Sequence, residues 1–371
     1  MHTNRYIYMD ILKFIAACMI VAIHFSCAGI NFEYTEILSF NILKKMMVDV
    51  CSIGVPLFFL VNGALLLNKD YNYKKILRKT AKLFIQFVFW SCITVFIIAK
   101  YNNIDLLQNG KIFFTNQLLF GSGGMVDVSH YWFIRVLICI YFFYPFIKHC
   151  YDNRKEKDSY FYIFLIILAF FSLIIPLFTF FAKMFPSIRI IDLSNLYEFF
   201  PLNYPIGTMM LYFIVGGLLQ NNLEKIKRIK FIYIIIAFIL SLVMLEFDWY
   251  ISSSYNGSTI RGVYTPYNSL PVMIMCISIF IIIFKINEKI KFPKFIENFI
   301  STIGNNTITI YYLNWILGYT LMPKIIEILI SNYHFTYGVW FNLLRTIIIV
   351  VICGYFGKLL GYIPIIKKIV K

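Results

Sequence analysis

The segment RYIYMDILKFIAACMIVAIHFSC, from Arg5 to Cys27, predicts a transmembrane helix with an unusual polar content. Most of its residues are apolar, and it exceeds the roughly 20 residues that a helix needs to cross the hydrocarbon of a bilayer. It nevertheless carries Asp10, Lys13 and His24. Because charged side chains in hydrocarbon are costly unless they face water or one another, we expect this helix to line a wet cavity.

The composition of the whole chain is that of an integral membrane protein. Of its 371 residues, 60% are hydrophobic and 14% are charged, whereas about 25% of the residues in soluble domains are charged. We predict an all-α integral membrane protein, a bundle of about ten transmembrane helices that forms a single domain over residues 1–371. The predicted spans are 6–27, 47–67, 83–99, 131–147, 159–182, 204–220, 231–247, 267–284, 299–319 and 339–357.

The basic residues indicate topology. The net charge is +16, but lysines and arginines recur in alternate connections between the apolar segments instead of forming one patch. By the positive-inside rule, both termini are expected to be cytoplasmic, and no nucleic-acid partner is expected. A cleavable signal peptide is not expected, because the first span is long and charged.

Two further features carry expectations about structure. The eight cysteines have no CxxC spacing, so we expect neither a disulfide framework nor a metal site. The longest outer segments, about 100–130 and 183–203, are expected to form ordered loops and short interfacial or re-entrant helices.

The polar residues of the first span share one helical face. Lys13 and His24 are eleven residues apart, about three turns and roughly 16 Å along the axis. Asp10 lies within about 40° of His24 by the same count, with Ala17 and Ile20 between them on the stripe. An acid, a base and an imidazole in register favour a functional face over a packing face.

Other spans supply polar residues that we expect at middle or outer depth. They are Asp49, His130, Arg135, Glu246, Asn314 and Arg345. Purely structural interpretations stay open for three of them. Glu246 would sit at the interface, Arg345 would extend to it, and Asp49 would pair with a lysine of the preceding loop.

Six segments of the sequence together resemble the motifs of one known family. LKFIAACMIVAIHFS has the Lys-x10-His spacing of its first helix, and GVPLFFLVNGALLL is similar to its second-helix motif, with Asn62 in place of the usual Ser. KKILRKTAKL resembles its basic segment, with Lys75-x-x-Arg78 for Arg-x-x-Arg. HYWFIRVLICIYFFYP, LYFIVGGLLQ and IGNNTITIYYLNWIL resemble its fourth, sixth and ninth helices, and in the last of these Asn314 stands in the place of a frequent His. The family that these segments resemble is the membrane-bound acyltransferase-3 family.

The resemblance implies an enzyme of the bacterial cytoplasmic membrane. Such an enzyme takes an acyl group, commonly acetyl from acetyl-coenzyme A, and transfers it to a hydroxyl of an envelope carbohydrate. His24, with Asp10 on the same stripe, would be the general base or a transient acyl carrier. Lys13, Lys75 and Arg78 would bind the coenzyme phosphates, although Lys75 and Arg78 also fit ordinary positive-inside signalling.

The remaining polar residues are assigned to the acceptor. His130 and Arg135 are expected to orient it or to stabilise the oxyanion of a tetrahedral intermediate. Trp132 would stack on a sugar, unless it belongs to the aromatic belt of the membrane. Asn62, Asn314 and Arg345 complete the predicted binding residues.

A transporter or flippase is the main alternative to an enzyme. It would also carry buried charges in about ten spans, and export and acyl transfer could share one cavity. A receptor or assembly factor is a third class, but it gives no reason for a base and a histidine in register. The sequence names neither the acceptor nor the oligomeric state.

Overall fold

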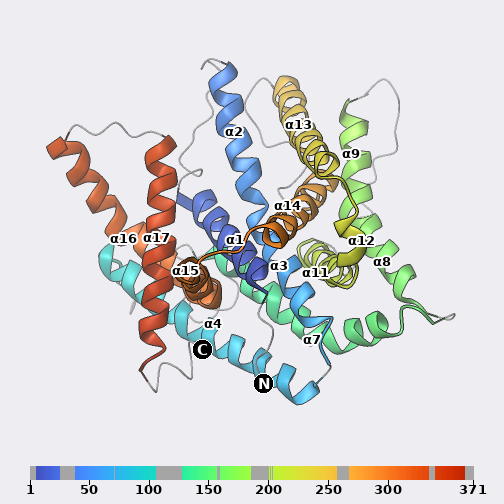
Figure 1. Cartoon of the computed structure of the whole chain (residues 1–371). Helices are drawn as coiled ribbons and strands as arrows, with labels where there is room; N and C mark the ends of the chain where they lie inside the picture. The colour runs from blue at the N-terminus through green and yellow to red at the C-terminus, as the bar shows by residue number, and fades with distance from the viewer. Residues whose placement is uncertain are drawn as a thin grey trace. The chain divides into compact units, whose positions relative to one another are not determined.

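The computed structural model describes residues 6–25, 38–70, 72–105, 128–156, 159–184, 200, 202, 204–256, 267–333 and 339–363. Within these ranges all regular structure is helical (Figure 1), which confirms the predicted all-α fold. The chain divides into two compact units, and each is described by itself. Unit 1 comprises Met1–Tyr71 and Tyr144–Ile300, and unit 2 comprises Asn72–Phe143 and Ser301–Lys371.

Eight helical segments of the described chain are long and apolar enough to cross a bilayer. They are Ile7–His24, Lys45–Leu66, Tyr73–Tyr101, Trp132–Asp152, Phe161–Ala182, Phe231–Ile251, Leu270–Lys289 and Leu343–Leu360. The other two predicted spans correspond to α11 (Ile206–Asn221), which has 16 residues, and α16 (Thr307–Tyr333), whose Tyr, Thr and Asn residues lower its hydropathy. The count of ten spans and the sidedness of the termini stay predictions.

Unit 1 contains most of the helices. They are α1 (Ile7–Phe25), α2 (Leu38–Ser52), α3 (Gly54–Leu66), the second half of α7 (Trp132–Asp152), α8 (Phe161–Ala169), a π-helical turn (Phe170–Ile174), α9 (Ile175–Met184), α11, α12 (Leu223–Lys227), α13 (Phe231–Asn256), α14 (Leu270–Lys289) and the first half of α15 (Lys294–Asn305). The predicted span 47–67 is divided between α2 and α3 at Ile53. Pro56 lies in the first turn of α3, where the missing N–H has no intrahelical partner to lose.

The closest packing in unit 1 is between α3 and α11. A methyl group on Gly63 would overlap the carbonyl of Phe213, and one on Gly216 would overlap the carbonyl of Leu60. Such backbone approach through small residues is a common way for membrane helices to associate, because lipid offers no hydrophobic drive between them. The segments GVPLFFLVNG and LYFIVGGLLQ therefore form one contact.

Tyrosines of α7 stabilise the end of this contact within unit 1. The hydroxyl of Tyr151 donates to the carbonyl of Gly217 at 2.7 Å, and the side-chain amide of Asn68 donates to the same carbonyl at 3.0 Å. Tyr144 donates to the carbonyl of Leu66 at 2.9 Å. These bonds connect α7 and Asn68 to the ends of α3 and α11.

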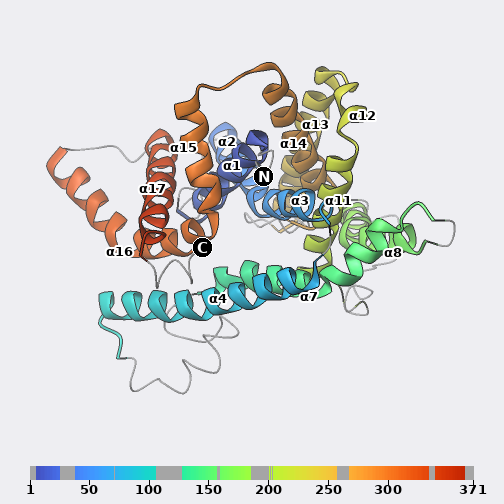
Figure 2. The same ribbon diagram turned by 60° about the horizontal axis from the view of Figure 1, so that its bottom comes forward.

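Unit 2 contains α4 (Tyr73–Tyr101), a short turn (Ser129–Tyr131), the first half of α7, the end of α15, α16 and α17 (Val339–Leu360). Figure 2 shows α4 as one continuous helix. Its 29 residues extend about 43 Å, beyond the roughly 30 Å of hydrocarbon. The basic segment KKILRKTAKL therefore forms the first turns of a helix, which Asn72 caps by accepting from the N–H of Lys75.

Asn306 divides the predicted span 299–319 between two helices. Its side-chain amide donates to the carbonyl of Thr302 at the end of α15, at 2.7 Å. Its own carbonyl accepts from the N–H of Ile310 in the first turn of α16, at 2.9 Å. A single asparagine thus ends one helix and begins the next, and hydropathy gives no signal for such a break.

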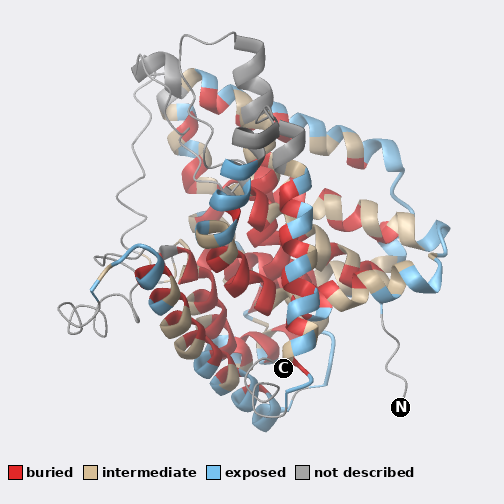
Figure 3. Cartoon of the chain, turned by 90° about the vertical axis from the view of Figure 1, so that its left-hand side faces the viewer, coloured by how far each residue is buried: buried red, intermediate tan, exposed pale blue. Residues whose placement is uncertain are grey.

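Buried and exposed residues follow helical faces (Figure 3). On α13, for example, Ile232, Ile236 and Leu240 are exposed, whereas Ile234 and Leu242 are buried. Exposed apolar faces of this kind suit contact with lipid. The predicted outer segments 100–130 and 183–203 lie mostly outside the described residues.

We expect Gly216→Ala to destabilise the protein, because the new methyl group would push α11 away from the backbone of α3. The matched control is Gly354→Ala on α17, where the nearest atom to the new methyl group is a side-chain carbon of Ile303 at 3.2 Å. Both changes raise helix propensity equally. Thermal unfolding in detergent should show a lower Tm for Gly216→Ala alone, and an unchanged Tm for that variant would contradict the packing described.

Candidate functional site

The polar stripe of α1 lies in unit 1. Asp10 is buried and forms an ion pair with Lys13, whose Nζ lies 3.6 Å from the carboxylate. Ala17 and Ile20 are buried, and His24 is partly exposed one residue before α1 ends. The acid and the base thus neutralise one another near the start of the helix, and the imidazole lies about three turns away along it.

Two other polar groups of unit 1 were singled out from the sequence. Asn62 donates its amide to the carbonyl of Phe58 in its own helix at 2.9 Å. Asp49 forms an ion pair with Lys45. The expected lysine partner is therefore present, but it lies on the same helix, α2, and not in the preceding loop. Glu246 lies on α13, which packs against α2, and both of its carboxylate oxygens are buried.

His130 lies in an aromatic cluster of unit 2. Its side chain is buried, and its ring stacks on Trp315 of α16 with centroids 3.8 Å apart and planes 18° from parallel. The rings of Tyr131 and Tyr311 lie beside it, and the hydroxyl of Tyr311 donates to its carbonyl. The imidazole is therefore fixed in orientation by groups on both α16 and its own chain neighbours.

The same cluster continues from α16 to α4. Tyr312 stacks on Trp90, with centroids 5.6 Å apart, and Tyr131 shares a hydrogen bond with Thr94 at 2.6 Å. The buried hydroxyl of Tyr312 has no hydrogen-bond partner among the described residues. Sequence analysis did not assign Trp315 or these partners. The only available signal was the aromatic run YYLNW, which packing alone would also explain.

Other predicted acceptor residues of unit 2 lie on three helices. Asn314 uses its amide hydrogens on its own helix, with the carbonyls of Ile310 and Tyr311 at 2.8 and 2.6 Å. Its Oδ1 is buried and accepts no hydrogen bond from the part of the chain that the structure describes. Trp132 and Arg135 are partly buried on α7, and Arg345 is buried on α17.

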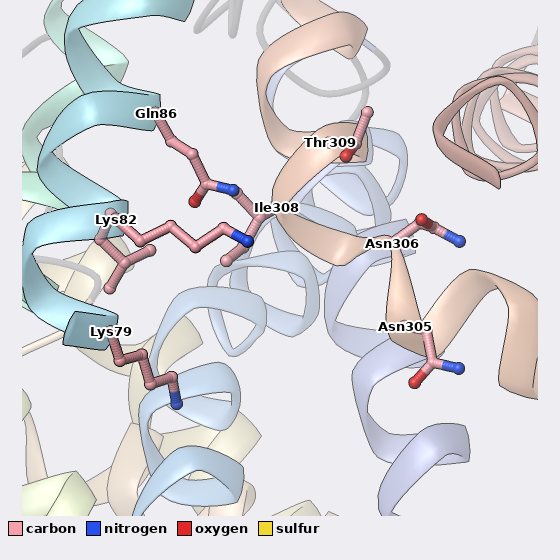
Figure 4. A pocket seen from close by; sticks show the side chains of 8 residues that line it. Lys79, Lys82, Gln86, Asn305, Asn306, Ile308 and Thr309 are labelled. Carbon is pink, nitrogen blue, oxygen red and sulfur yellow. The ribbon is translucent and has the colours of Figure 1, made fainter. Parts of the chain in front are cut away.

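A pocket of about 410 Å³ lies between α4 and the junction of α15 and α16. Figure 4 shows Lys79, Lys82 and Gln86 extending from α4 toward the junction. The lining residues are Lys79, Lys82, Leu83, Gln86, Asn305, Asn306, Ile308 and Thr309. All of them belong to unit 2.

The pocket combines positive charge with neutral hydrogen-bonding groups. Lys79 lies 4.7 Å from the centre of the Tyr141 ring. Neither Lys79 nor Lys82 forms an ion pair with a described carboxylate. Gln86, Asn305 and Asn306 supply side-chain amides to the lining, and Thr309 supplies a hydroxyl. An anion that also carries amide groups would find complementary partners here.

Lys75 and Arg78, which the family motif indicated, lie on α4 just before the pocket. Both are exposed, and neither lines the pocket. Residues 75, 79, 82 and 86 follow a helical spacing of four, three and four, which places them on one face of α4. This periodicity is the signal in the sequence that could have indicated the pocket. It includes Lys75 of the family motif but not Arg78.

The pocket and the aromatic cluster use the same two helices. Thr309 of the pocket and Trp315 of the cluster are six residues apart on α16, about 9 Å along its axis. Gln86 and Trp90 are one turn apart on α4. Among the described residues, no group of three or more His, Cys, Asp or Glu side chains is arranged to hold a metal ion.

Comparison with known proteins gives one match. The family model for the acyltransferase domain, acyltransferase 3, matches residues 6–358. No curated protein matches the chain, and no solved structure matches it. The match extends over both units and all of the helical segments quoted from the sequence. The chain therefore belongs to the acyltransferase-3 family of membrane proteins.

Proposed function

We propose that this acyltransferase moves an acetyl group from cytoplasmic acetyl-coenzyme A to a hydroxyl of an envelope glycan or its precursor, in the bacterial cytoplasmic membrane. The observation that carries the proposal is the pocket of Lys79 and Lys82 at the basic end of α4. The charge distribution of the sequence predicts that this end of α4 is the cytoplasmic one. The donor would therefore reach the pocket from the compartment that contains it.

The chemistry of coenzyme A fits the lining of this pocket. Its phosphates are anions, and its pantetheine arm carries amides. Lys79 and Lys82 offer ammonium groups that no described carboxylate neutralises, and Gln86, Asn306 and Thr309 offer hydrogen-bonding groups to an amide chain. Charge-assisted bonds to phosphate are stronger than neutral ones, so the lysines would supply most of the affinity.

Acyl transfer from a thioester requires a base. The base takes the proton of the acceptor hydroxyl as its oxygen attacks the carbonyl carbon, and the proton passes to the thiolate when the carbon–sulfur bond breaks. His24 remains our proposed base or acyl carrier, with Asp10 and Lys13 on the same face of α1. His130 is the second candidate, because it lies in the unit that contains the pocket.

Acceptor binding is proposed for polar groups of unit 2. A buried acceptor without a donor costs about 1–3 kcal/mol, and the Oδ1 of Asn314 has no donor among the described residues. A sugar hydroxyl would satisfy it. Arg135 and Arg345 would stabilise the oxyanion or orient the sugar, and Trp132 would stack on it. Asn62 belongs to unit 1, and its role in substrate binding is proposed from its place in the sequence motif alone.

We expect the double variant Lys79→Ala/Lys82→Ala to raise the KM for acetyl-coenzyme A roughly tenfold or more, with a smaller effect on kcat, because each lysine supplies a charge-assisted bond to phosphate. The comparison is Lys75→Ala/Arg78→Ala, which removes the same charge from the same helix outside the pocket. Lys74→Ala, an exposed change in the first turn of α4, is the neutral control. A larger KM effect of the Lys75/Arg78 pair would place the coenzyme phosphates outside the pocket.

The identity of the base is tested by His24→Ala and His130→Ala. Loss of the general base is expected to lower turnover by about 10²- to 10⁴-fold per folded molecule. We expect this loss of turnover for His24→Ala. For His130→Ala we expect mainly a higher KM for the acceptor. Turnover is measured as free thiol released from acetyl-coenzyme A, with size-exclusion profiles as the folding control. Near-normal turnover in well-folded His24→Ala would assign the base to His130.

The function as a whole is tested with labelled acetyl-coenzyme A and envelope glycans. Transfer of label to a glycan by the purified protein in proteoliposomes supports the enzyme. Accumulation of an unmodified substrate inside vesicles, without label transfer, would support the transporter or flippase instead.

A further inference from the structure

A second pocket lies in unit 1, and none of the residues assigned above lines it. It has a volume of about 490 Å³ and is formed where α12, α13 and α14 meet. Its lining residues are Lys227, Phe231, Lys285, Ile286, Glu288 and Lys289. α13 and α14 pack side by side (Figures 1 and 2), so the pocket is held by two adjacent candidate membrane spans.

One lysine of this pocket has a structural role. The Nζ of Lys227 lies 3.0 Å from a carboxylate oxygen of Glu224 and 3.0 Å from one of Glu288, and so connects α12 to α14. The hydrogen bonds that Lys227 donates to Glu288 and Glu224 raise the pKa of Lys227 above its usual value, so it stays charged at neutral pH. One ammonium and two carboxylates leave these three groups with a single net negative charge.

The other two lysines carry charge that the described residues do not balance. Lys285 donates one hydrogen bond to the carbonyl of Lys227 at 2.8 Å, which leaves two donors on its ammonium group. Lys289 has no hydrogen bond or ion pair with a described residue, and neither lysine contacts a described carboxylate. Two ammonium groups therefore line one pocket, and both have N–H donors that no described residue uses.

The apolar side of the pocket lies at the start of a candidate membrane span. Phe231 lines the pocket at the first residue of α13 and is 43% exposed. About a third of a turn around the helix from Phe231, α13 presents a row of exposed apolar side chains that a membrane would cover. They are Ile232, Ile236, Ile239, Leu240 and Val243.

We propose that this pocket binds the phosphodiester headgroup of an anionic phospholipid, with Lys285 and Lys289 on the phosphate and the acyl chains along the exposed face of α13. Charge complementarity favours this occupant over a zwitterionic lipid. The apolar wall of Phe231 and Ile286, at the start of a candidate membrane span, favours a lipid over a free anion. Basic pockets between membrane helices on the cytoplasmic side are suited to anionic lipid headgroups.

The experiment uses the full-length protein purified in a neutral maltoside detergent. Binding is measured by native mass spectrometry and by the shift in Tm with three probes: short-chain phosphatidylglycerol, short-chain phosphatidylcholine and inorganic phosphate. We expect saturable binding of phosphatidylglycerol, and neither saturable binding nor a Tm shift with the other two. Equal binding of inorganic phosphate would overturn the lipid as the source of the anion.

Two charge-matched pairs of variants locate the site. Lys285→Gln/Lys289→Gln removes the proposed contacts, and we expect phosphatidylglycerol affinity to fall roughly tenfold or more. Lys291→Gln/Lys294→Gln removes the same charge from the following segment, whose lysines do not line the pocket, and should leave affinity unchanged. Equal losses in both pairs would reduce the effect to general surface charge and overturn the site.

A third variant controls for folding. Lys285→Gln also removes a hydrogen bond to the backbone, so the double variant is checked for monodispersity. If it fails to fold, Lys289→Gln alone decides the question, because Lys289 makes no bond with the described protein. Unchanged phosphatidylglycerol affinity in Lys289→Gln would then contradict the proposal. None of these measurements depends on acyl transfer.

Discussion

The contact of α3 with α11 is the constraint on which the rest of unit 1 depends. Residues Gly54–Val61 of α3 are buried on every face, and the helix also packs against α1 and α14. A helix that is apolar all round belongs inside a bundle, but lipid provides no hydrophobic force to hold it there. Gly63 and Gly216 stabilise the packing of α3 on α11, because they allow the two backbones to approach closely enough for many dispersion contacts to form.

Hydropathy and charge in the sequence predicted the fold class well and helix boundaries less well. The predicted helical spans have helical counterparts, because long apolar segments in a membrane leave the backbone few alternatives. The beginning of α4 at Tyr73 was missed because the segment before residue 83 is rich in lysine. Lysine lowers hydropathy but favours helix. The break at Asn306 was missed because it depends on single hydrogen bonds, which hydropathy does not register. The break at Ile53 was missed because the segment is apolar on both sides of it and Ile53 makes no side-chain cap.

The candidate site was predictable in its residue types and less so in its partners. His130 and Asn314 were identified because polar groups in apolar spans require a reason. Their surroundings depend on contacts between α4, α7 and α16, which lie far apart in the sequence. For the donor, the family motif indicated Lys75 and Arg78, whereas the pocket is lined by residues one helical turn further along the same helix.

The distribution of ion pairs gives the net charge a chemical meaning beyond topology. Any lysine at the basic ends of the spans would satisfy the positive-inside rule, whether or not it had a partner. Some described lysines pair with carboxylates on the same helix or a neighbouring one and so stabilise helices: Lys13, Lys45, Lys148 and Lys227. Others have no described carboxylate partner and line pockets: Lys79, Lys82, Lys285 and Lys289.

A lysine whose charge is already balanced gains little from an anion, whereas an unbalanced lysine beside a cavity gains a full charge-assisted bond. The presence of a described carboxylate partner, more than the position in the chain, therefore distinguishes the lysines that stabilise helices from the lysines that are available to a ligand.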